Sequence, residues 1–216
     1  TLLTLTGDAA DNDITVTQVA NNQLKVVGNN GTLIKHGTDP GVAELTFTFT
    51  PDAQGAVKKL KVDLKDGENR VTIGDGVTTV DLRKLDQFKA GAHADTMILN
   101  KVKVGGNVTI DAGKNFAANN TVQVLGSEIV GNLKIYTGGG NANVTINGGT
   151  NIKGNLLIDA GFGAHNITVQ DVTVQGSAVN KINAGKDFQN DVVNVNVSNL
   201  SSAGGLKVTT GGGNDV

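Results

Sequence analysis

The chain of 216 residues contains no cysteine, no tryptophan and only two prolines, and aromatic residues make up 3% of it. Without cysteine, disulfide bonds, thiolate metal sites and a cysteine nucleophile are excluded. No run of about 18 apolar residues occurs, so the sequence predicts no membrane-spanning helix. The formal net charge is only -2 and there is no basic run, which argues against a nucleic-acid partner.

Glycine is plentiful instead, at 30 positions, and 38% of the residues are hydrophobic. Collagen needs a third glycine and much proline, and a long helix tolerates little glycine, so neither class fits. The hydrophobic content and the low net charge argue against disorder. We therefore expect a folded domain rich in turns.

A short phrase recurs along the chain: an aliphatic or aromatic residue, two further residues, and then glycine. The mean spacing between its lead residues is about 24 residues. The lead residues are Leu64, Phe88, Ile110, Ile135, Ile158, Ile182 and Val208. A second row with the same mean spacing follows the glycines, at Val71, Met97, Val122, Val144, Ile167, Val192 and Val216.

Apolar residues alternate with polar ones inside each repeat, as in Val144-Thr145-Ile146, and this period of two is typical of strands. A repeat of two or three short strands cannot bury its apolar side alone, but stacked copies can. The sequence predicts an all-β, right-handed parallel β-helix (β-solenoid) of about 24 residues per coil and roughly nine coils. Residues 57–216 are the regular coils, and residues 1–56 are irregular N-terminal coils or a cap. Within that cap, residues 17–56 are either wider coils or a hairpin over the mouth of the tube.

Asparagine recurs at one corner of the repeat, a short distance before the second apolar row. Stacked amides can bond to each other and to turn backbone, so we interpret these residues as a structural ladder. Its members are Asn69, Asn120, Asn143, Asn166, Asn190 and Asn214, and Asn12 and Asp95 take the same place.

Residues that might carry chemistry are few. Asp8, Asp11 and Asp13 form an acidic group that is a weak candidate for calcium, and no other cofactor or metal is predicted. His93 and His165 lie three coils apart, so we expect solvated corner histidines and not a shared metal site. No catalytic motif occurs, and coils of even length leave no inserted loop to build a cleft, so we predict no enzyme.

The Gly- and Asn-rich coils of residues 57–216 resemble bacterial secreted and cell-surface β-helix proteins of the adhesin or filamentous-haemagglutinin kind. The tail Gly211-Gly212-Gly213-Asn214-Asp215-Val216 distantly resembles the calcium-binding turn of RTX repeats. The resemblance implies a bacterial protein, secreted or on the cell surface, with a structural or adhesive role.

The two ends lack an amphipathic capping helix, and reading from Val216 into Thr1 and Leu2 completes the repeat pattern. The main hypothesis is a structural extracellular protein whose subunits stack head to tail into a filament or surface layer. The assembly ends would be Thr1, Leu2, Leu3, Asn214, Asp215 and Val216. The alternative is an adhesin stalk or carbohydrate-binding module of a larger secreted repeat protein, with surface polysaccharide as a partner. Because the chain starts at Thr1 without a signal peptide, we expect a processed product or a piece of a longer protein.

Overall fold

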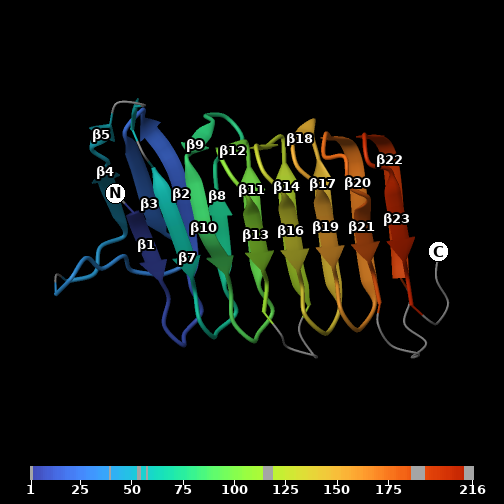
Figure 1. The fold of residues 1–216 in the computed structure, drawn as a ribbon. Coiled ribbons are helices and arrows are strands. Elements are labelled where there is room, and N and C mark those ends of the chain that lie inside the picture. Colours follow the sequence, from blue (N-terminus) through green and yellow to red (C-terminus); the bar gives the residue numbers. More distant parts are fainter. Residues whose placement is uncertain are drawn as a thin grey trace.

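The computed structural model describes residues 2–38, 40–52, 55–56, 58–113, 119–185 and 193–211, and for residues 51, 52, 55 and 56 the backbone alone. Its regular elements are all strands, which stack side by side along one axis (Figure 1). None of the described residues forms a helix of the length and apolar character needed to cross a membrane. The predicted class, an all-β parallel β-solenoid, is confirmed.

Parallel strands line three faces of the solenoid. The first face is a sheet of eight strands: β1 (Leu2–Thr6), β7 (Lys59–Asp63), β10 (Lys84–Lys89), β13 (Val108–Asp111), β16 (Leu133–Tyr136), β19 (Leu156–Asp159), β21 (Asn180–Asn183) and β23 (Leu206–Thr209). The second face contains β2 (Asp13–Ala20), β8 (Arg70–Ile73), β11 (Thr96–Asn100), β14 (Asn120–Leu125), β17 (Ala142–Asn147), β20 (His165–Val174) and β22 (Val193–Ser202). The third face contains β9 (Val80–Leu82), β12 (Val102–Val104), β15 (Glu128–Ile129) and β18 (Thr150–Ile152), and it continues into the second halves of β20 and β22.

The solenoid has about six turns of about 25 residues, and not nine. Complete turns start at β7, β10, β13, β16, β19 and β21. The expectation of nine coils divided the whole chain by the repeat length. It failed because an antiparallel excursion takes residues after β2 out of the winding path.

That excursion is a hairpin built on the second face. Strand β3 (Gln23–Gly28) pairs antiparallel with β2, and β4 (Glu44–Thr48) pairs antiparallel with β3. A further short pair, β5 (Pro51–Asp52) with β6 (Gly55–Ala56), precedes β7. Of the two possibilities left open for residues 17–56, the structure shows the hairpin. It lies beyond β2 at the N-terminal end of the stack (Figure 1).

The two apolar rows are columns of directly paired residues. In the first, Ile110 pairs with Ile135 and Ile135 pairs with Ile158, as the repeat predicts. In the second, Val122 pairs with Val144 and Val144 pairs with Ile167. All these side chains are fully buried, and each contributes roughly 1.5–3 kcal/mol of burial free energy.

Two members of these rows were assigned incorrectly. Phe88 pairs with Val62, not with Leu64, because Gly67 lies two residues further from its paired strand residue than Gly91 does, which shifts the glycine phrase along the chain. In the second row, Ile167 pairs with Val195, so Val195 takes the place predicted for Val192. Val192 itself and Val216 lie outside the described residues.

The glycine of the recurring phrase is required by the stacking of turns. Gly161 has φ of 79°, a conformation that L side chains rarely adopt. A Cβ atom there would lie 1.6 Å from the carbonyl oxygen of Gly138 in the previous turn. Where alanine precedes this glycine, as at Ala112 and Ala160, it is fully buried. Only small residues therefore let successive corners approach each other.

Candidate functional site

The corner between the first and second faces carries a ladder of polar side chains. Each Oδ1 atom accepts a hydrogen bond from the backbone N–H of the residue one turn earlier. The bonds run from Asn12 N–H to Asn69 at 3.1 Å, from Asn69 N–H to Asp95 at 2.9 Å, and from Asp95 N–H to Asn120 at 3.0 Å. Asn69, Asp95 and Asn120 are buried. The predicted ladder is therefore present over four consecutive turns.

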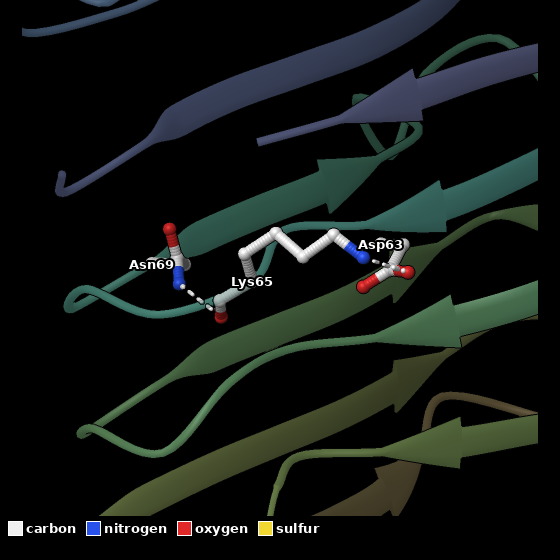
Figure 2. Close-up of polar contacts among 3 residues, drawn as sticks. All are labelled: Asp63, Lys65 and Asn69. Carbon is white, nitrogen blue, oxygen red and sulfur yellow. Dashed lines mark hydrogen bonds and ion pairs between the residues drawn. The ribbon is translucent and has the colours of Figure 1, made fainter. Parts of the chain in front are cut away.

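The amide nitrogens of the ladder close the adjoining turns. Asn69 Nδ2 donates to the Gly67 carbonyl at 2.8 Å, and Asn120 Nδ2 donates to the Thr137 carbonyl at 2.9 Å. Figure 2 shows the turn after β7, where the same Asn69 amide reaches the Lys65 carbonyl while the Lys65 ammonium pairs with Asp63. The Lys65 hydrogen bond lowers the pKa of the Asp63 carboxyl. Asn69 thus joins two turns and fixes its own corner, whereas Asn120 donates to the corner of the following turn.

Asp95 is the exception in this ladder, because a carboxylate has no N–H to donate. Its Oδ1 accepts the bond from Asn69, but its Oδ2 is buried and has no hydrogen-bond partner among the described residues. Burial raises the pKa of the Asp95 carboxyl to about 6, although the Asn69 hydrogen bonds and nearby His93 oppose the rise. A protonated carboxyl has one O–H donor and would resemble the amide of the neighbouring rungs.

The ladder ends at Asn120. The next places in the column are taken by Ala142, His165 and Val193. Asn143 and Asn166 each lie one residue further along, where the strand turns their side chains out to solvent, so their assignment to the ladder was wrong. Asn190 and Asn214 lie outside the described residues.

The two histidines predicted to be solvated corners differ from each other. His93 is exposed, and its Nδ1 accepts a hydrogen bond of 3.3 Å from the Gly67 N–H. His165 is buried in the column that follows Asn120, so the prediction was wrong for this residue. It starts strand β20 at an inward position, which its place after glycine and alanine did not indicate.

A second ladder runs along the corner between the third and first faces, and the sequence analysis missed it. Asn107 Oδ1 accepts from the Asn132 N–H at 2.8 Å, and Asn132 Oδ1 accepts from the Asn155 N–H at 2.8 Å. The preceding glycine makes room for the amide of the previous turn. A Cβ atom at Gly154 would lie 2.5 Å from Asn132 Oδ1. The signal in the sequence was a Gly-Asn pair that recurs at residues 106–107, 131–132 and 154–155.

The acidic residues near the N-terminus, named above as weak calcium candidates, accept hydrogen bonds from backbone and side-chain amides. Asp8 accepts from the Ala10 N–H at 3.0 Å, and Asp11 accepts from the Glu68 N–H at 2.8 Å. The Asp13 carboxylate accepts from the side-chain amides of Asn29 and Asn30. Within the described part of the chain, no three His, Cys, Asp or Glu side chains are placed to bind a metal ion.

The N-terminal end of the solenoid is largely covered. Aliphatic and aromatic side chains of the hairpin region, Leu24, Val26 and Phe49, are buried against the first turns. Lys58 is buried beside them and donates to Gln18 Oε1 and to the Asn21 carbonyl, both at 2.7 Å. Burial lowers the pKa of Lys58.

A cleft of about 480 Å³ remains at this end, between β1, β4 and residues 32–37. Its apolar lining includes Leu3, Leu5, Ile14, Ile34, Phe47, Phe49 and Leu64. Lys35 and His36 also line it, and no acidic residue does among those that the structure describes.

Among the described residues, no strand covers the last turn at the other end in this way. Strand β22 pairs only with β20, and β23 pairs only with β21, among the strands that the structure describes. Val195, Val197 and Leu206 are only partly buried there, and Val208 is 42% exposed. Val62 occupies the same column as Val208 and is fully buried. Two ends of unlike structure are therefore the main surface features of the molecule.

Comparison with known proteins assigns no relative to the chain. No family model matches it, and neither the curated proteins nor the solved structures gave a match.

Proposed function

We propose that the chain is a structural protein, a stiff β-solenoid that serves as a stalk or spacer in a bacterial extracellular or cell-surface assembly. The observation that carries this function is the contrast between a covered N-terminal end and an open last turn with partly exposed aliphatic side chains. An open strand edge recruits another strand, so we expect further β-structure to cover this turn. Right-handed winding belongs to the same proposal.

A filament of head-to-tail subunits is the second candidate, and the column register favours it. Leu5 pairs with Val62 at the head of the column whose last described member is Val208. Stacking β23 of one copy on β1 of the next would continue this column with Val208 against Leu5. The junction predicted from the sequence joined Val216, a member of the second row, to Thr1 and Leu2. It fits less well, because β1 belongs to the first face and not to the second.

The hairpin obstructs this stacking. Strands β3 and β4 extend the second face by two positions beyond β2, whereas no described strand lies beyond β1. If β23 of one copy paired with β1 of the next, β22 of the first copy would fall where β4 of the second already lies. A filament therefore needs the hairpin to move, and this favours the stalk.

Negative-stain microscopy and sedimentation velocity of the purified chain distinguish the two candidates. The stalk predicts short rods that associate, if at all, through the C-terminal edge, so that Val208→Lys abolishes association and Thr4→Lys at the N-terminal edge does not. Long filaments that both substitutions abolish equally would overturn the stalk in favour of head-to-tail assembly.

A further inference from the structure

The cleft beside β1 has the shape of a missing strand. All six residues from Leu2 to Gly7 line it. Successive side chains of a strand point to opposite faces, so lining by every residue means that the backbone edge of β1 borders the cleft. That edge pairs with no strand among the described residues, since β1 bonds only to β7.

Strand β3 of the hairpin determines how far the cleft extends along the solenoid axis. On the second face β3 lies one strand beyond β2, while the corresponding position beyond β1 is empty of described strands. A strand added to β1 would lie about 4.8 Å from it and face the apolar residues of the cleft. Its inward side chains would continue the columns that contain Leu3 and Leu5.

The charges of the cleft restrict the occupant further. Lys35 and His36 are exposed residues of the lining, and none of the described lining residues is an aspartate or glutamate. A segment that carries a carboxylate is favoured over one that carries a cation.

We propose that this cleft binds an extended peptide segment, of about five residues, by strand addition to β1. The segment has aliphatic side chains at alternate positions, which enter the cleft, and an acidic residue close to Lys35 and His36. Main-chain hydrogen bonds to β1 supply affinity, and the apolar lining supplies selectivity. This binding site is independent of what covers the other end of the rod.

A blocked synthetic hexapeptide that copies residues 155–160, Asn-Leu-Leu-Ile-Asp-Ala, is a suitable probe. Strand β19 belongs to the same face, and Ile158 lies in the column that contains Leu5. The control peptide carries Ile158→Pro, because the N–H groups of alternate residues along β19 and at its end, such as Ala160, donate to the following turn, and Ile158 is the residue whose donor would point toward β1. Fluorescence anisotropy of labelled peptide measures binding to the full chain.

Hydrogen exchange of the backbone amides identifies the site. We expect bound peptide to slow exchange at alternate residues of Leu2–Thr6, and the proline control not to bind. Equal binding of the proline peptide would show an apolar pocket without strand pairing. Slowed exchange in β22 or β23, and not in β1, would place the peptide at the opposite end. Either result, or no binding at all, overturns the site.

Two substitutions in the lining complete the test. Ile34→Trp fills the cleft and should weaken binding by about tenfold or more, and Lys35→Glu should weaken it about threefold. Val77→Trp is the matched control, because Val77 is 74% exposed and does not line the cleft. If Ile34→Trp fails to fold, Lys35→Glu and the proline peptide still test whether the peptide binds in this cleft by strand addition. If sedimentation shows that wild-type copies associate and that Ile34→Trp or Lys35→Glu abolishes this, the occupant is a second copy of the chain, and the peptide site is wrong.

Discussion

At the scale of single residues, the corner ladder contains one ionisable side chain in a buried position that disfavours its charged form. Asp95 occupies a place that asparagine takes in three neighbouring turns, and burial favours its neutral form. The unfolded chain has an ordinary carboxyl pKa of 3.8, and the folded chain has a pKa of about 6. Because the folded state holds the proton more tightly, ionisation of Asp95 destabilises the fold.

Asp95→Asn should therefore stabilise the protein at neutral pH. The gain reaches at most about 3 kcal/mol above pH 7, from a shift of about two pKa units. It should decline as the pH falls through 6 and be small near pH 4, where the carboxyl is protonated in the folded state and about half protonated in the unfolded state. Urea unfolding at pH 4, 5, 6 and 7 measures this dependence.

Glu68→Gln is the control for this substitution, because Glu68 is an exposed carboxylate beside the same ladder. It should change the free energy of unfolding by less than about 0.5 kcal/mol at every pH. A gain for Asp95→Asn that did not vary with pH would contradict the assignment of the effect to ionisation.

At the scale of the structural element, the second ladder shows how consecutive turns are held in register. Asn132 accepts from the Asn155 N–H and donates its own N–H to Asn107. The first bond depends on the side chain of Asn132, while the second depends on its backbone.

Asn132→Ala should destabilise the fold by about 1–2 kcal/mol, because the partly buried Asn155 N–H loses its acceptor. Asn132→Asp keeps an acceptor oxygen and should cost less. Asn143→Ala is the matched control, since Asn143 is exposed and off both ladders, and it should stay within about 0.5 kcal/mol. Equal losses for Asn132→Ala and Asn143→Ala in chemical denaturation would show that the ladder does not stabilise the stack.

The elements also show what the sequence could predict. Alternation and the 24-residue spacing gave the parallel stack and the pairing of Ile110, Ile135 and Ile158 correctly, since a register error of one residue would turn each of them to solvent. The same spacing misplaced Leu64, because glycine marks the turn and the distance from strand to glycine varies.

The corners were harder to predict than the strands. Asn143 and Asn166 look like ladder members in sequence, but a shift of one residue puts them outside. The cleft beside β1 could not be inferred at all, because it depends on where residues 32–37 and β4 pack against β1. That packing is a tertiary arrangement of an irregular segment, which carries no periodic signal.

At the scale of the whole molecule, stability should differ along the axis. In stacked repeats each turn contacts only its neighbours, so the cost of a substitution depends on whether a turn is covered on both sides. Val62 and Val208 share one column, but Val62 is fully buried and Val208 is 42% exposed.

Val62→Ala should destabilise the protein by about 1–3 kcal/mol, and Val208→Ala by about 0.5 kcal/mol or less. The two substitutions remove the same atoms, so each is a control for the other in thermal or urea unfolding. Equal costs would mean that the last turn is already covered in solution, for example by association between copies.

The glycine of each turn that faces the asparagine amide of the previous turn bears on how the solenoid could become longer. The Asn132 amide lies over Gly154, and the next asparagine along, Asn155, lies over Gly176 in the same manner. A duplicated turn would present the same amide to the same glycine and would find its partners already in place. Tandem copying of one repeat unit would therefore lengthen the rod and keep this contact at the new junction.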